Sequence, residues 1–204
     1  AYPYGSKKIE SSIKQIPTYV EKMKENGVEL VDSIQALLSR VDAVMLMTFD
    51  GHPRVEQAME VIKAGKPLFI NKPFAASLKD VIKIMDTAKK YNCPIFSSSP
   101  TRYLNGAQAA RNGSIGDIMG ADSYSGCPLE PTHPDFYWYG IHGIEILFTM
   151  MGKDCHTVQR RHTQNTDHVV GIWDNDRIGT YRGIRKGKVT HSGVAYGLNE
   201  ILPA

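Results

Sequence analysis

The stretch from residue 44 to residue 73 limits the possible folds of this chain most, because it reads as two strands joined by one helix. Residues 44–47 form a short apolar run, typical of a strand buried on both faces of a parallel sheet. A helix follows Pro53, ends at Ala64-Gly65-Lys66 and leads into a second apolar run at residues 68–70. This pattern predicts a βαβ unit whose two loops lie at the carboxyl edge of the sheet, where open α/β sheets bind ligands.

Lys72 comes directly after the second predicted strand, in the sequence Asn71-Lys72-Pro73. The βαβ unit therefore places Lys72 at the ligand edge, and the following proline favours an extended backbone there. A single lysine beside a turn is more commonly a solvated surface residue. On these residues alone, both interpretations of Lys72 stay open.

Strands and helices alternate on both sides of this unit, which predicts a doubly wound α/β sheet in residues 1–99. We expect further helices at residues 18–26, 34–39 and 77–91, where Asp32-Ser33 can cap the second and Ser77 the third. We also expect further strands at 28–31 and 93–96. Residues 100–204 predict an α+β domain with a mostly antiparallel open sheet and helices on one side. Its expected helices span residues 105–112 and 136–151, and its expected strands lie near residues 118–124, 157–163, 168–173, 177–184 and 189–195. Residues 198–204 read as an interrupted element.

The first domain lacks the glycine-rich turn of a complete dinucleotide-binding fold. Such a fold begins with a strand and a G-x-G-x-x-G turn, and that strand lies at the centre of the sheet. Without it, the strand expected at residues 28–31 has no neighbour that joins it to residues 44–47. We therefore expect a fragment with an incomplete Rossmann-like domain, 1–99, and a partial C-terminal domain, 100–204.

The composition argues against several classes of protein. A hydrophobic content of 42% and a charged content of 22% are ordinary for a globular chain. The net charge of +3 is slight and no basic tract is long, so we expect no nucleic-acid partner. No apolar run reaches the roughly 20 residues of a membrane helix, so we expect no membrane partner. Cys93, Cys127 and Cys155 lie far apart without metal-ligand spacing, so we expect free thiols, no metal site and a cytoplasmic location, with export left open.

A second motif lies in the helix expected at residues 136–151. One face of this helix is apolar, and a separate stripe at helical spacing contains Trp138, His142, Glu145 and Thr149. A histidine and a glutamate one turn apart can pair, which orients the ring. Gly140 and Gly143 each cost a helix up to about 1 kcal/mol relative to alanine, which fits the close approach of a bulky group. A ligand beside the helix and a helix packed tightly on a sheet are equally compatible with this motif.

Taken together, these segments resemble the Gfo/Idh/MocA oxidoreductases, a family named after glucose–fructose oxidoreductase, inositol dehydrogenase and a rhizopine-catabolism protein. The family has a Thr-Pro loop ending in histidine, a helix ending in Ala-Gly-Lys, a strand ending in Glu-Lys-Pro, and D-x-G-x-H-x-x-D on a later helix. Phe49 replaces the proline, Asn71 the glutamate and Trp138 the first aspartate, while Glu145 conservatively replaces the last one. With these departures, the chain resembles a divergent subgroup of the family that has Asn-Lys-Pro and WYGIHG motifs. The resemblance covers about residues 27–197.

The resemblance implies an NAD(P)-binding dehydrogenase of sugar metabolism that uses NAD or NADP and acts on a sugar, cyclitol or related polyol. Lys72 would polarise the reacting oxygen, with its proton affinity lowered by burial, and His142 would move the hydroxyl proton. The cofactor side would comprise Thr48, Phe49, Asp50, His52, Asn71, Lys72 and Pro73. The substrate side would comprise Thr101, Arg102, Tyr103, Trp138 and Glu145. The resemblance also implies a homo-oligomer that associates through the C-terminal sheet.

Two other functions stay open on the sequence. A non-catalytic sugar- or nucleotide-sensing member of the same fold is favoured by Trp138 and Asn71, which replace the two acidic residues. A structural protein that dimerises through its open antiparallel face is the third possibility, because a fold does not by itself give a function. We expect the fragment alone to be inactive and to bind dinucleotide poorly, because the glycine-rich turn that holds the pyrophosphate is absent from it.

Overall fold

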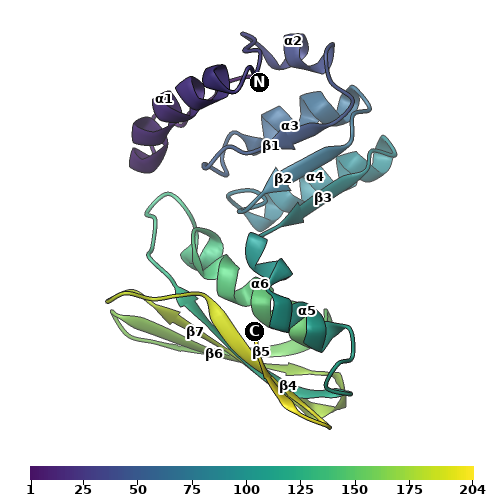
Figure 1. The fold of residues 1–204 in the computed structure, drawn as a ribbon, viewed down its shortest axis with the longest axis vertical. Coiled ribbons are helices and arrows are strands. Elements are labelled where there is room, and N and C mark those ends of the chain that lie inside the picture. Colours follow the sequence, from purple (N-terminus) through teal and green to yellow (C-terminus); the bar gives the residue numbers. More distant parts are fainter. The chain divides into compact units, whose positions relative to one another are not determined.

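The computed structural model describes residues 1–204, which divide into two compact units, Ala1–Ser97 and Ser98–Ala204 (Figure 1). This division lies close to the boundary at residues 99–100 that the sequence suggests. Each unit has a hydrophobic core of its own. No helix in the structure is both long enough and apolar enough to cross a membrane.

The first unit contains the βαβ arrangement that the sequence predicts (Figure 1). Three strands lie in the order β1 (Val44–Leu46), β2 (Leu68–Asn71) and β3 (Ile95–Ser98). Helix α3 (Arg54–Lys63) joins β1 to β2, and α4 (Leu78–Lys90) joins β2 to β3. Strands β1 and β2 are parallel, with Val44 opposite Leu68. The loops at residues 48–52 and 71–73 therefore both follow the carboxyl ends of parallel strands.

Only one face of the three-stranded sheet is packed against helices. Its buried core joins α3 and α4 to β1 and β2 through Val44, Leu46, Ala58, Ile62, Leu68, Ile70, Ile84 and Ala88. On the other face Met45 is 68% exposed, and the rings of Phe69 and Phe96 lie 5.7 Å apart. The expectation that residues 44–47 are buried on both faces is therefore wrong for this chain.

The N-terminal segment differs from its prediction in two places. Helix α1 (Glu10–Glu25) begins well before residue 18 and contains Pro17, because Ile9 and Ser12 are buried and anchor its first turn. Residues 28–31 form no strand, and the Val31 amide instead donates to the Ala1 carbonyl at 2.8 Å. The other local predictions for this unit are confirmed, including α2 (Ile34–Leu38) and the Ser33 and Ser77 hydroxyls that cap α2 and α4.

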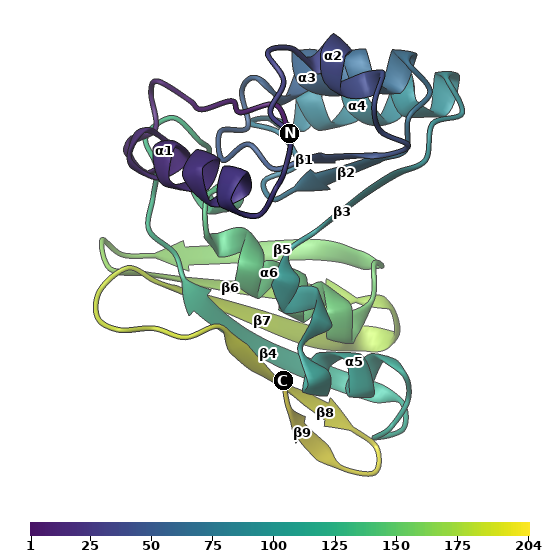
Figure 2. The same ribbon diagram turned by 45° about the horizontal axis from the view of Figure 1, so that its top comes forward.

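The second unit is a six-stranded sheet in the order β5-β6-β7-β4-β8-β9 (Figure 2). Its strands are β4 (Ile118–Gly126), β5 (Cys155–His162), β6 (Thr166–Trp173), β7 (Arg177–Ile184), β8 (Ser192–Gly197) and β9 (Ile201–Pro203). Only the β4–β7 pair is parallel, so the mostly antiparallel sheet is confirmed. Residues 198–204, expected as an interrupted element, contain β9, which pairs with β8 as the second strand of a hairpin.

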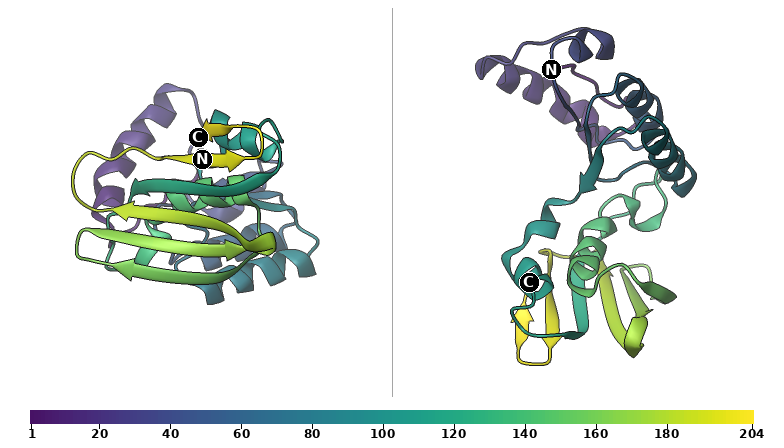
Figure 3. Two further views of the ribbon diagram at one scale, coloured as in Figure 1. Left: turned by 90° about the horizontal axis from the view of Figure 1, so that it is seen from below. Right: turned by 90° about the vertical axis from the view of Figure 1, so that its right-hand side faces the viewer.

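Helices α5 (Asn105–Arg111) and α6 (Gly140–Met151) lie on one face of this sheet and leave the other face open (Figures 2 and 3). The core between α6 and the sheet includes Ile146, Trp173 and Tyr181. Three short 3-10 helices complete the unit, namely η1 (Pro100–Tyr103), η2 (Asp135–Tyr137) and η3 (Asp174–Asp176). Because α6 begins at Gly140, Trp138 precedes the helix, and its expected place in the stripe with His142 is wrong.

Candidate functional site

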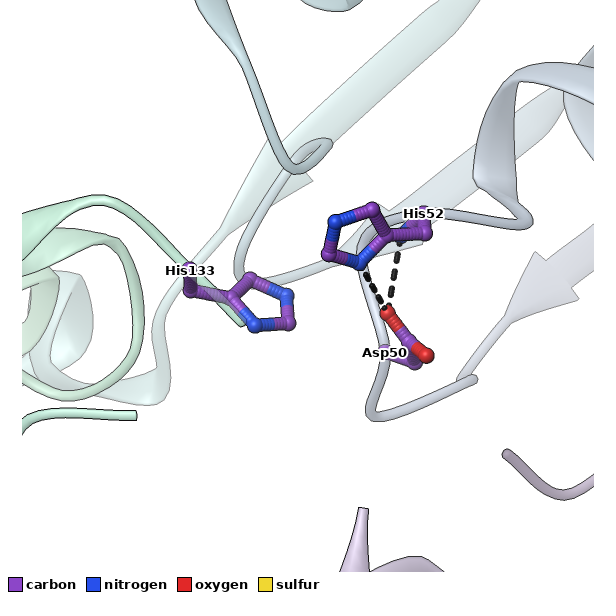
Figure 4. Close-up of side chains that lie close together, drawn as sticks. All are labelled: Asp50, His52 and His133. Atoms are coloured by element: carbon purple, nitrogen blue, oxygen red, sulfur yellow. Dashed lines mark hydrogen bonds and ion pairs between the residues drawn. The ribbon is translucent and has the colours of Figure 1, made fainter. Parts of the chain in front are cut away.

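Asp50 organises the loop that follows β1. Its Oδ2 accepts a hydrogen bond from the Ser6 hydroxyl at 2.6 Å. Its Oδ1 accepts from the His52 amide at 2.9 Å and lies 2.7 Å from His52 Nδ1 (Figure 4). Burial by itself raises the pKa of the Asp50 carboxyl, but the hydrogen bonds from Ser6 and His52 outweigh it and hold this pKa below its usual value. Asp50 is therefore ionised at neutral pH, and its hydrogen bonds fix the conformation of the loop.

Arg54, which the sequence did not single out, ties the loop after β1 to the loop after β2. Its side chain is fully buried in the first turn of α3, and its guanidinium donates to main-chain carbonyls of both loops. The acceptors are the carbonyls of Thr48, Asn71, Lys72 and Pro73. Burial lowers the pKa of Arg54 and the nearby Asp50 opposes this shift, so the group stays cationic at neutral pH. A cation at a helix N-terminus is unfavourable without a specific partner, and this was the available signal in the sequence.

Other contacts within the first unit fix the same two loops. The Thr48 hydroxyl donates to Gln57 Oε1 at 3.0 Å, and the Phe49 ring lies 6.4 Å from that of Tyr19. A Cβ on Gly51 would lie 2.7 Å from the Ala75 carbonyl carbon, so only glycine allows the loops to approach this closely. The structure thus brings together the segments expected to form the cofactor side. Many of the hydrogen-bonding groups of these segments are used in contacts that stabilise the two loops.

Lys72 is half-buried at the end of β2. Burial, followed by the positive charge of Arg54, lowers the pKa of the Lys72 ammonium to about 8. The predicted lowering of its proton affinity is confirmed. At neutral pH the group is mainly protonated, and it can give up its proton more readily than an exposed lysine.

In the second unit, Glu145 connects α6 to the segment that follows β3. Its Oε1 accepts from Arg102 Nε at 2.5 Å, and its Oε2 accepts from the Ser99 amide at 2.9 Å. The expected pairing of Glu145 with His142 is therefore wrong, because the carboxylate binds Arg102 and Ser99 instead. Arg102 and Glu145 also border a groove of about 640 Å³ along α6, which Arg111, Phe148 and Lys153 help to line.

His142 is 7% exposed and is held by contacts from several elements of the second unit. Its Nδ1 lies 2.6 Å from the Ser99 hydroxyl oxygen. Its ring stacks on that of His191, with centroids 5.0 Å apart, and meets the edge of the Tyr139 ring at 5.4 Å. No pattern in the sequence indicates Ser99 or His191, because both lie far from His142 along the chain and outside any motif.

The remaining residues expected on the substrate side differ in their surroundings. The Trp138 ring lies 5.2 Å from that of His133 and 6.0 Å from that of Tyr139. Tyr103 is 56% exposed. The Thr101 hydroxyl donates to the His142 carbonyl at 2.9 Å. The Thr101 hydroxyl is therefore used within its own unit, and its expected reach toward a substrate stays a prediction.

The first unit matches a family of known proteins in sequence. Residues 7–99 match a family described as an oxidoreductase family with an NAD-binding Rossmann fold, GFO_IDH_MocA. An inositol 2-dehydrogenase of Gluconacetobacter diazotrophicus is 30% identical over 97 residues, which cover 44% of this chain and 28% of that protein. An uncharacterized oxidoreductase of Streptococcus pneumoniae is 28% identical over 102 residues, which cover 47% of this chain and also 28% of the relative. The matched part of the chain thus spans less than a third of either relative.

Solved structures extend the likeness in fold to the second unit. A probable dehydrogenase from Thermotoga maritima has a TM-score of 0.76 at 20% identity, and the match covers 92% of this chain and 65% of that one. A scyllo-inositol dehydrogenase from Lactobacillus casei, solved with NAD(H) and scyllo-inositol, has a TM-score of 0.74 at 17% identity, covering 96% and 66%. The fold is that of a Rossmann-type α/β domain followed by a mixed-sheet domain. The sequence match over residues 7–99 supports a Gfo/Idh/MocA family oxidoreductase, and the likeness in fold extends over most of the chain.

Proposed function

We propose that this protein is an NAD- or NADP-dependent oxidoreductase that transfers a hydride between the nicotinamide and a carbon of a sugar, cyclitol or related polyol. The observation that supports this most is Lys72. Lys72 lies directly after β2, a strand of the parallel β1–β2 pair, in a unit that matches the family. The pKa of its ammonium is lowered to about 8. The relatives named as inositol dehydrogenases favour a cyclitol among these substrates.

The donor groups at the end of β2 fit the nicotinamide end of such a cofactor. Asn71 and Lys72 are adjacent at the end of the strand and offer amide and ammonium donors, which ribose hydroxyl and carboxamide oxygens accept. Arg54 binds the main-chain carbonyls of these loops, so their backbone is fixed before any ligand arrives. When bound, the cofactor supplies the acceptor or donor of the hydride.

Lys72 and His142, the two candidate catalytic residues, have different roles at the substrate hydroxyl. Lys72 donates a hydrogen bond to the substrate oxygen and stabilises the negative charge that develops on it. His142 accepts the proton of the same hydroxyl as the C–O bond becomes a carbonyl. In the reverse reaction His142 returns this proton to the oxygen.

The test is turnover by the full-length protein, followed by nicotinamide absorbance with a panel of inositols and aldoses. Lys72→Met is expected to lower kcat/KM at least about a hundredfold, the low end for general acid–base groups. His142→Ala is expected to do likewise, and the double variant to be little worse, because residues that act as a unit are non-additive. Lys63→Met, at an exposed lysine in α3, is the control. Unchanged turnover in Lys72→Met would contradict the proposal.

A sensing function is the second candidate, and Trp138 and Asn71 favour it because neither supplies the carboxylate of the family pattern. It requires the wild-type protein to bind a polyol or a dinucleotide without converting it. Calorimetric binding together with absent turnover across the panel would support the sensor and exclude the enzyme.

We further propose that the open face of the six-stranded sheet joins two copies of the chain. This face carries cross-strand apolar residues, such as Ile172 opposite Ile178, and the side chain of Ile178 is 53% exposed. Next to them, Asp122 accepts hydrogen bonds from Thr180 and from Tyr196, the latter at 2.7 Å. An ordered face with apolar and satisfied polar groups is suited to a self-complementary interface.

A further inference from the structure

A chain of hydroxyl groups leads to His142, and its hydrogens can be counted. The Thr101 hydroxyl donates to the His142 carbonyl at 2.9 Å, and a carbonyl only accepts. This contact uses the single hydrogen of Thr101 Oγ1. The Ser99 and Thr101 hydroxyl oxygens lie 2.7 Å apart, so the hydrogen between them comes from Ser99.

Ser99 Oγ therefore has no hydrogen left for His142. Its two lone pairs accept from the Thr101 amide, at 3.2 Å, and from His142 Nδ1, at 2.6 Å. If Ser99 instead donated to His142 Nδ1, the two hydroxyl oxygens would face each other at 2.7 Å without a hydrogen between them. Thr101 is 7% exposed and Ser99 is fully buried, so a bare oxygen pair of this kind would be costly.

We infer that Ser99 and Thr101 are positioning residues that fix the neutral tautomer of His142 with its proton on Nδ1. The lone pair of the neutral ring then lies on Nε2, the nitrogen that can take up a hydroxyl proton. Neither Trp138 nor Glu145 offers the ring a carboxylate, since Glu145 binds Arg102 and the Ser99 amide. The catalytic use of this tautomer rests on the proposed function, whereas the tautomer itself does not.

The tautomer can be read directly from long-range proton–nitrogen NMR spectra of the full-length protein labelled with ¹⁵N-histidine. The His142 signals are identified by their loss in His142→Gln, and the tautomer is read at a pH where titration shows the ring to be neutral. In the wild type, Nδ1 is expected to have the shift of a protonated nitrogen and Nε2 that of an unprotonated one. A wild-type ring with its proton on Nε2 would overturn the inference.

Two substitutions at Thr101 form a matched pair. Thr101→Val removes the hydroxyl but keeps the shape, which frees the Ser99 hydrogen for Nδ1 and should move the ring proton to Nε2. Thr101→Ser keeps the hydroxyl and should keep the wild-type tautomer. If Thr101→Val does not fold, Ser99→Ala serves instead, because it removes the acceptor of the Nδ1 proton and should raise the Nε2–H population. An unchanged tautomer in the folded variant contradicts the inference.

Activity gives a separate readout. Thr101→Val should lower kcat about tenfold or more with KM little changed, in the range typical of residues that orient a functional group, and Thr101→Ser should retain activity. A protein that converts no polyol but shows the expected tautomers would refute the proposed function and leave this inference standing. A protein that converts polyols but carries the His142 proton on Nε2 would support the proposed function and refute this inference.

Discussion

At the scale of single residues, Arg54 shows how one buried cation can shape a candidate site through its contacts with main-chain carbonyls. Backbone carbonyls at the ends of β1 and β2 would otherwise need water or another donor, because buried polar groups are rarely left unsatisfied. The guanidinium supplies several fixed donors at once, which a lysine cannot do in the same geometry. Arg54 therefore determines the shape of the loop that carries Lys72.

We expect Arg54→Met to lower the free energy of unfolding by at least about 2 kcal/mol, because a carbonyl that loses its donor costs about 1–3 kcal/mol. Urea unfolding followed by circular dichroism measures this change. Lys63→Met, an exposed position in the same helix, is the control and should change stability by less than about 0.5 kcal/mol. Equal stability of the two variants would contradict the role of Arg54.

Asp50 gives a prediction with a defined pH dependence. Its pKa lies below the usual 3.8, so its contribution to stability is complete above that pH and is lost as the pH falls through the lower, folded-state pKa. Asp50→Asn should therefore cost about 1–3 kcal/mol at pH 7, the range for hydrogen bonds to a buried charged group. The difference from wild type should shrink toward zero as the carboxyl becomes protonated. Unfolding curves at pH 7 and in acid, with the exposed Asp86→Asn as control, test this, and a difference that is constant with pH would refute it.

At the scale of elements, α6 shows why two glycines are placed in one helix. A Cβ on Gly143 would lie 2.4 Å from Tyr181 Cε2, and one on Gly140 would lie 2.8 Å from Phe136 Cβ. The bulky groups that the glycines admit are thus aromatic side chains of the same unit. For the glycines, the interpretation as a helix packed tightly on a sheet is the correct one, and it places His142 firmly over the sheet.

Gly143→Ala is expected to destabilise the protein by about 1–3 kcal/mol through overpacking, although alanine is the better helix former. Adding Tyr181→Leu should recover part of this loss relative to Tyr181→Leu alone, because it removes the ring that the new methyl group meets. Thermal and urea unfolding of the four proteins form a double-mutant cycle. A more stable Gly143→Ala variant would show that the approach of Tyr181 is not tight.

At the scale of the whole molecule, each of the two units has one sheet face under helices and one face open. The proposed association through the open face of the larger sheet predicts a dimer in sedimentation analysis of the full-length protein. Ile178→Lys should shift it to monomer, because it places a charge among apolar side chains of that face. Val158→Lys is the matched control, since Val158 is 64% exposed and lies opposite Gly171, on the face that carries α6. A monomeric wild type would contradict the interface.

The sequence by itself determined the parts of this protein that depend on near neighbours in the chain. Apolar runs and turn residues determined β1, α3 and β2, Ser33 and Ser77 marked helix starts, and Gly65 marked a helix end with φ of +69°. Motif spacing also placed Lys72 at the end of a strand. These features depend on backbone geometry and on periodicity, which are local properties.

Only the tertiary structure decided which polar groups meet. Arg54 reaches the carbonyl of Asn71, and Ser99 reaches His142, across stretches of chain that no local rule connects. Glu145 likewise binds Arg102 rather than its helical neighbour His142, and β9 pairs with β8 in a hairpin that no pattern in the sequence indicated. The physical reason is that a hydrogen bond in a protein interior needs a partner at about 3 Å with the right direction. Packing of distant segments sets that distance and direction.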